Sequence, residues 1–193
     1  MKKKTVEIPD VQEIEKELLR VKERQKYHSV FSNTVFSLIS VVAVAVLICV
    51  LFMPVLRIYG TSMNPILHDG NIVLTLKGSD FECGDIVAFY FNNKILVKRV
   101  IASSGEWVNI DEAGNVYVND VLLDEPYLKE KSQGENDITF PYQVPENKFF
   151  VLGDHRETSV DSRSSSLGCV AEEQVVGRIM FCVWPLQDFG ILK

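Results

Sequence analysis

Residues 85–101 read DIVAFYFNNKILVKRVI, and this stretch decides the fold class. Its two β-branched and aromatic runs are separated by Asn92-Asn93, which is typical of a β-hairpin. Side chains alternate between the two faces of a strand, so Lys98 and Arg99 point in opposite directions. We therefore expect one of these two charged side chains to face the core.

Further short runs of the same kind follow residue 57, and turns with Gly or Asn separate them. These runs are 71–76, 107–110, 116–118, 149–152 and 175–183, with polar loops at 129–137 and 162–168. No internal repeat or long helical pattern appears in this part of the chain. Residues 57–193 are therefore predicted to form one all-β domain with antiparallel sheets.

A nearly continuous apolar run without charge, residues 35–56, precedes the β region. Some twenty helical residues, at about 1.5 Å each, cross a hydrocarbon core of about 30 Å. A cleaved signal peptide would have a shorter apolar core, placed nearer the N-terminus. We interpret residues 35–56 as a retained transmembrane signal-anchor helix.

Residues 1–34 are predicted to be a cytoplasmic tail, because basic residues concentrate before the apolar run and only Arg57 follows it closely. The same rule places residues 57–193 outside the cytoplasm. A short amphipathic helix is predicted within the tail, and it could pair with another helix, lie on the membrane or be solvated. Its narrow apolar seam is Val11, Ile14, Leu18 and Val21.

Charge and cysteine content exclude several classes of protein. The first 29 residues hold 8 basic and 6 acidic residues, and the remainder holds 12 and 20, so the acidic main domain argues against a nucleic-acid partner. Only three of the four cysteines lie outside the apolar run, which allows at most one intramolecular disulfide and excludes a disulfide scaffold. No spacing fits a zinc site, and we expect no metal or other cofactor.

Ser62, in Gly60-Thr61-Ser62-Met63-Asn64-Pro65, is a candidate nucleophile just beyond the apolar run. A serine hydroxyl needs a nearby base. Burial disfavours the charged form of lysine, and a Lys98 pKa of roughly 7–8 would suit a general base. A Ser-His-Asp triad through His68 or His155 is the rival, although no Gly-x-Ser-x-Gly elbow is present. From these residues alone, two other interpretations remain: Ser62 could be an ordinary turn residue, and Lys98 could be an ordinary lysine of an edge strand.

A third stretch, residues 153–163, places many hydrogen-bonding groups in a loop after a predicted buried strand. Within it, Asp161 and Arg163 could form an ion pair, and Ser159 could orient a lysine ammonium.

Together these segments resemble bacterial type I signal peptidases, from about residue 35 to Val183. Gly-x-Ser-Met-x-Pro, Gly-Asp-Ile-Val, Val-Lys-Arg-Val and Gly-Asp-x-Arg-x-x-Ser-x-Asp-Ser-Arg occur in the family's order. Residues 116–119 and 125–127 are similar to the Gram-positive members.

The resemblance implies an all-β serine endopeptidase with a Ser-Lys dyad, which cleaves signal peptides from exported preproteins. Carried over by position, Ser62 is the nucleophile, Lys98 the general base and Ser159 the residue that orients the lysine. Asp161 and Arg163 are implied as a supporting pair. The Ser62 N–H would contribute to the oxyanion hole, and Gly60 lacks the hydroxyl that some members add there.

We therefore expect an enzyme of the bacterial cytoplasmic membrane whose substrates carry small residues one and three positions before the cut. An extended substrate would pair with strand edges near residues 57–61. Expected walls of its shallow apolar pockets are Met63, Leu67, Leu96 and Val97. The alternatives are a related peptidase that processes pilin or conjugation substrates, and an inactive membrane-anchored binding module, against which Ser62 and Lys98 argue.

Overall fold

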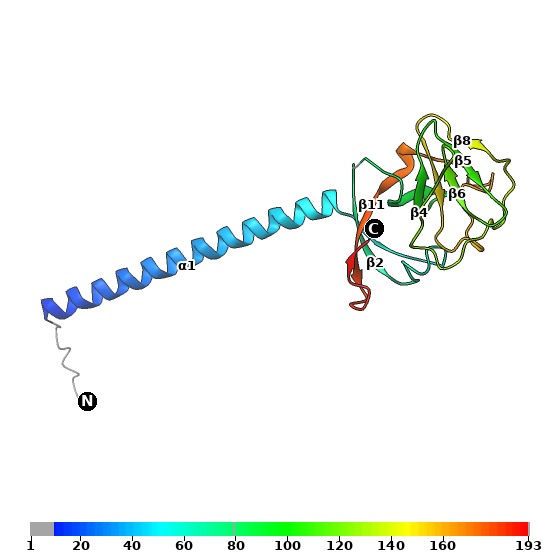
Figure 1. Cartoon of the computed structure of the whole chain (residues 1–193). Helices are drawn as coiled ribbons and strands as arrows, with labels where there is room; N and C mark the ends of the chain where they lie inside the picture. Colours follow the sequence, from blue (N-terminus) through cyan, green and yellow to red (C-terminus); the bar gives the residue numbers. More distant parts are fainter. Residues whose placement is uncertain (1–9, 79, 193) are drawn as a thin grey trace. The chain divides into compact units, whose positions relative to one another are not determined.

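The computed structural model describes residues 10–78 and 80–192, and only the backbone of Glu13 and Ile14. Residues 1–9 of the predicted tail, and the Ile14 side chain of the predicted seam, lie outside the described residues. The chain divides near Cys49 into a helix and a β-rich domain (Figure 1).

The helix α1, Val11–Phe52, is continuous over 42 residues. The expectation of a separate short helix in the tail is therefore corrected, because no Gly or Pro interrupts this region. Its length of about 63 Å is about twice a hydrocarbon core, and its apolar part is long enough to cross a membrane. Pro54 ends the helix, since it disfavours helical geometry at the preceding residue.

The β domain contains two sheets in which every strand pair is antiparallel, so the predicted all-β class is confirmed. The larger sheet has the order β1-β2-β11-β3-β4-β9-β10, with β12 paired to β11, and the smaller one has the order β7-β6-β5-β8. The strands are β1 Val55–Arg57, β2 Ile72–Leu76, β3 Ile86–Phe91, β4 Lys94–Ala102, β5 Trp107–Ile110, β6 Val116–Val118, β7 Val121–Leu122, β8 Tyr142–Gln143, β9 Lys148–Leu152, β10 Val170–Ala171, β11 Val175–Trp184 and β12 Gly190–Ile191. A short 3-10 helix, Glu172–Gln174, precedes β11.

The β3–β4 hairpin forms where the sequence predicted it. Phe91 pairs with Lys94, and Asn92 and Asn93 have φ angles of 46° and 61°, as a two-residue turn with both residues left-handed requires. Asparagine tolerates this conformation better than most residues. The turn therefore fixes the register that places Lys98 opposite Val87.

Two of the strand edges that have no partner among the described residues belong to β1 and β4. The strand β1 pairs only with β2. The strand β4 pairs with β3 along its first half, but β9 joins its other edge only from Arg99 onward. Residues 94–98 of β4 therefore have one free edge, and β1 has another.

Candidate active site

Ser62 lies in a tight turn that follows β1 and is anchored in the core. Gly60 has a φ of +92°, which favours glycine, and its N–H donates to Asp69 at 2.8 Å. Met63 and Leu67 are buried in the main apolar cluster, and the Leu67 N–H donates to the Met63 carbonyl at 2.9 Å. These contacts hold the half-buried Ser62 at the surface of a rigid segment.

Lys98 is only 3% exposed, near the middle of β4. Burial lowers its pKa from the ordinary 10.5 to about 8, while the Asp161 carboxylate opposes part of that shift. Its ammonium donates to the Ser159 hydroxyl at 2.8 Å. The lysine is therefore held in one orientation and releases its proton far more readily than an exposed lysine.

Ser62 and Lys98 line the same groove, which has a volume of about 650 Å³. One wall is β1 and the residues after it, and the other is the first half of β4. Gly153 ties the site together, since an added Cβ there would lie within 2.6 Å of both the Ser62 carbonyl oxygen and the Ser159 Cβ. Within the described residues, Lys98 hydrogen bonds to Ser159, and no hydrogen bond joins it to Ser62.

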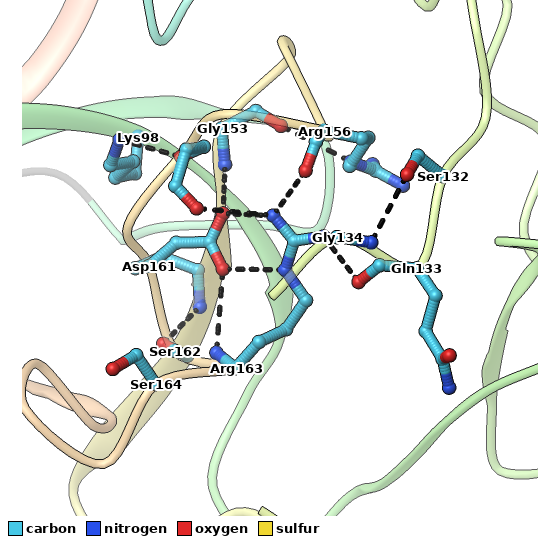
Figure 2. Close-up of polar contacts among 12 residues, drawn as sticks. Lys98, Ser132, Gln133, Gly134, Gly153, Arg156, Asp161, Ser162, Arg163 and Ser164 are labelled. Atoms are coloured by element: carbon cyan, nitrogen blue, oxygen red, sulfur yellow. Dashed lines mark hydrogen bonds and ion pairs between the residues drawn. The ribbon is translucent and has the colours of Figure 1, made fainter. Parts of the chain in front are cut away.

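The Asp161–Arg163 pair lies behind Ser159. Arg163 Nε and Nη2 each donate to Asp161 at 2.8 Å, and both side chains are buried. Asp161 also accepts from the Gly153 N–H at 3.0 Å, while Arg163 donates to the carbonyl oxygens of Arg156 and Ser159 at 2.8 and 3.3 Å (Figure 2). This fork fixes the loop that carries Ser159.

Two further buried ion pairs support the same loop, and the sequence did not predict them. Arg99 donates to both oxygens of Asp154, at 2.9 and 2.7 Å, and its guanidinium lies 3.8 Å from the centre of the Tyr127 ring. Arg156 pairs with the buried Glu125. The expectation that only one of Lys98 and Arg99 faces the core is thereby corrected, because both faces of this end of β4 are covered.

The four expected pocket residues separate into two groups. Leu96 and Val97 line the groove. Met63 and Leu67 are 2% and 0% exposed and pack in the core beneath the nucleophile turn. The structure therefore gives Met63 and Leu67 a supporting position and leaves the groove walls to β1 and β4.

Neither histidine of the rival triad lines the groove that holds Ser62. The His155 ring contacts the Thr158 hydroxyl at 2.6 Å, and His68 lies 4.0 Å from Asp188. The His155 backbone N–H donates to the Ser62 carbonyl oxygen at 3.0 Å, so this residue supports the turn through its main chain. Among the described residues, Lys98 lines the groove beside Ser62, and neither of these two histidines does.

All four cysteines are free thiols. Among residues 10–78 and 80–192, no group of three or more His, Cys, Asp or Glu side chains is arranged to hold a metal ion.

Comparison with known proteins identifies similar chains. The family described as "Signal peptidase, peptidase S26" matches residues 31–184. A "Signal peptidase I" of Bacillus licheniformis is 33% identical over 180 residues, which cover 86% of this chain and 95% of that protein. A "Signal peptidase IB" of Staphylococcus aureus is 38% identical over 153 residues, which cover 68% and 78% of the two chains. A crystal structure of a signal peptidase I from Enterococcus faecalis V583 covers 52% of this chain and 97% of its own, with 32% identity and a TM-score of 0.45.

Proposed function

The chain belongs to the signal peptidase family, peptidase S26, and we propose that Ser62 and Lys98 carry out its chemistry as nucleophile and general base. It is a membrane-anchored serine endopeptidase that cleaves signal peptides from exported preproteins. The observation that carries the assignment is the buried Lys98 amine, which is oriented by Ser159 in the groove that contains Ser62.

In the proposed reaction, neutral Lys98 accepts the Ser62 hydroxyl proton as the oxygen attacks the scissile carbonyl carbon. The Ser62 N–H donates to the developing oxyanion. The Lys98 ammonium then returns a proton to the leaving amine, and an acyl-enzyme ester remains on Ser62. A water molecule, deprotonated by the same lysine, hydrolyses this ester and restores the free serine.

The substrate is proposed to bind as an extended strand between the free edges of β1 and β4, where both edges have unpaired backbone groups. Along both walls of the groove the chain runs toward Ser62 and Lys98. One wall runs from Val55 to Ser62 and the other from Lys94 to Lys98. Val55 follows Phe52, the end of α1, by three residues. The signal peptide therefore enters from the Val55–Lys94 end, which is the end connected to the anchor. Leu96 and Val97 form the shallow apolar walls that select small side chains.

The first prediction concerns membrane orientation. The segment before residue 35 is proposed to be cytoplasmic and the domain from residue 57 to lie outside, since Lys22, Arg24 and Lys26 precede the apolar run. External protease added to intact protoplasts is expected to digest the β domain and to spare an epitope tag at the N-terminus. Protection of the β domain in intact protoplasts, together with its digestion after lysis, would reverse the orientation.

The second prediction is a pH–rate profile with an acidic limb near pH 8. Only neutral Lys98 can accept a proton, and with a pKa of about 8 about a tenth of it is neutral at pH 7. We expect kcat/KM for a peptide substrate to rise roughly tenfold above pH 7 and to level off beyond about pH 9. An activity that climbs steadily to pH 10.5 would show that Lys98 is not the base or is not buried.

A further inference from the structure

A second cavity, of about 500 Å³, is built on the nucleophile turn but shares no lining residue with the substrate groove. Three segments form its walls: part of the nucleophile turn, the polar loop after Tyr127 and the loop after β9. The lining residues are Asn64, Pro65, His68, Lys129, Glu130, Lys131, Ser132, Asp154, His155, Arg156 and Glu157. It adjoins the reaction centre, because the His155 N–H in its wall donates to the Ser62 carbonyl oxygen.

The direction of the substrate strand brings a peptide to this cavity. If the signal portion enters at the Val55–Lys94 end and reaches the dyad, the residues after the scissile bond must continue past Ser62. The turn itself leads from Ser62, in the groove, to Asn64 and Pro65, in the wall of the cavity. The cavity is therefore on the path that the chain takes away from the anchored end.

We propose that this cavity binds the first residues of the mature protein, immediately C-terminal to the scissile bond. This inference rests on the proposed function of Ser62 and Lys98. It assigns the enzyme a second recognition region, chemically distinct from the apolar groove on the signal side.

The walls suit a polar, extended peptide. Asp154 and Arg156 are buried and neutralised by Arg99 and Glu125. The exposed charges are the Lys129 and Lys131 ammonium groups and the Glu130 and Glu157 carboxylates, so both signs are present. Such walls can pair with polar side chains of either charge, whereas Leu96 and Val97 on the signal side cannot.

Asn64 adds a separate observation. Its side-chain oxygen is buried and has no hydrogen-bond partner among the described residues. A buried acceptor without a donor destabilises the free protein. A backbone N–H of the bound peptide would supply the donor after a rotation of the Asn64 amide, which lies two residues from the nucleophile.

Cross-linking of a bound preprotein tests the location. Full-length Ser62→Ala protein in detergent would be mixed with a signal-peptide substrate that carries a photoreactive phenylalanine analogue either three residues after or five residues before the scissile bond. The downstream probe is expected to label residues 64–68, 129–132 or 154–157, and the upstream probe residues 55–59 or 94–97, as read by mass spectrometry of the conjugates.

Each other outcome counts against the inference. If the upstream probe labels the groove and the downstream probe labels other residues or none, the second recognition region is wrong. The proposed function would remain intact. Failure of both probes to label the protein would remove the proposed function, and this inference with it.

A charge reversal provides an independent measurement with active enzyme. Glu157→Lys should raise the kcat/KM ratio of substrates with Asp over those with Lys at one of positions two to four after the cut, by roughly fivefold. Glu173→Lys is the matched control and should leave the ratio unchanged, because Glu173 is an exposed glutamate of the short 3-10 helix that does not line this cavity. Equal ratios in the two variants would contradict the inference.

Discussion

Alanine in place of either Ser62 or Lys98 should lower kcat/KM for signal-peptide cleavage by at least about a thousandfold, because groups that act as a unit lose nearly all their effect when one is removed. Ser62→Ala removes the attacking oxygen. Lys98→Ala leaves the serine without a group whose pKa, at about 8, permits proton transfer near neutral pH. The double variant should be hardly worse than either single one. Cleavage of a fluorogenic signal peptide by the full-length proteins in detergent measures all three rates.

Folding can be separated from chemistry by Lys98→Met. The buried lysine is held with a pKa of about 8 in place of 10.5, which costs the fold on the order of 3 kcal/mol below pH 8. Between pH 8 and pH 10.5 the unfolded chain binds more protons at Lys98 than the folded protein does. The destabilisation caused by the buried lysine therefore falls as the pH rises from 8 to 10.5. Lys98→Met is therefore expected to be inactive and yet to unfold at a higher temperature than the wild type at pH 7, with the difference shrinking toward pH 10.

The histidines supply the control for the identity of the base. His68→Ala and His155→Ala should keep most of the activity, since neither ring lines the groove. A histidine variant as inactive as Lys98→Ala would restore the triad and reject the lysine mechanism.

The fold was predictable where local sequence and tertiary structure agree. The Asn92-Asn93 turn and the apolar runs of β3, β4 and β11 each indicate their structure without help from distant residues. Of the strands of two or three residues, β6 was predicted, whereas β1, β7, β8, β10 and β12 were too short to show a periodic pattern. These strands exist because a neighbouring strand supplies hydrogen bonds. The helix differed for another reason: nothing in its sequence separates the charged tail from the apolar run, so the two form one helix.

The sequence indicated which residues belong to the candidate site, but it did not indicate how most of them are paired in space. Asp161 and Arg163 are two residues apart, and their pairing could be proposed from spacing. Arg99 and Asp154 are 55 residues apart and Glu125 and Arg156 are 31 apart, so nothing local indicates either pair. Glutamate, aspartate and arginine are rarely buried unless paired, yet a sequence does not reveal which of its charges will be buried. The burial of Met63 and Leu67 was not predictable for the same reason, because an apolar residue near a nucleophile can equally support the turn from below.

Gly153→Ala should reduce kcat by roughly a hundredfold or more while the protein still folds, because a displacement of about 1 Å at a catalytic group can cost that much. The added methyl would collide with the Ser159 side chain and the Ser62 carbonyl oxygen together. It would therefore push the nucleophile turn away from the serine that orients Lys98. Overpacking of this kind destabilises by about 1–3 kcal/mol, which an otherwise folded domain can tolerate. Ser159→Ala should lose less activity, since it removes one orienting hydrogen bond and moves nothing.

Gly190→Ala is the matched control for this effect. Neither Gly190 nor Gly153 has a φ in the left-handed region. An added Cβ at Gly190, however, would have no atom within 4 Å. Both variants add one methyl group to a glycine of the β domain. When the two are assayed at the same substrate concentration, only Gly153→Ala should lose activity. The loss should appear in kcat more than in KM, because the binding edges of β1 and β4 are not moved. A Gly153→Ala enzyme with near-normal kcat would mean that Ser62 and Lys98 do not depend on the close approach of the two loops at Gly153, and that the site is held together elsewhere.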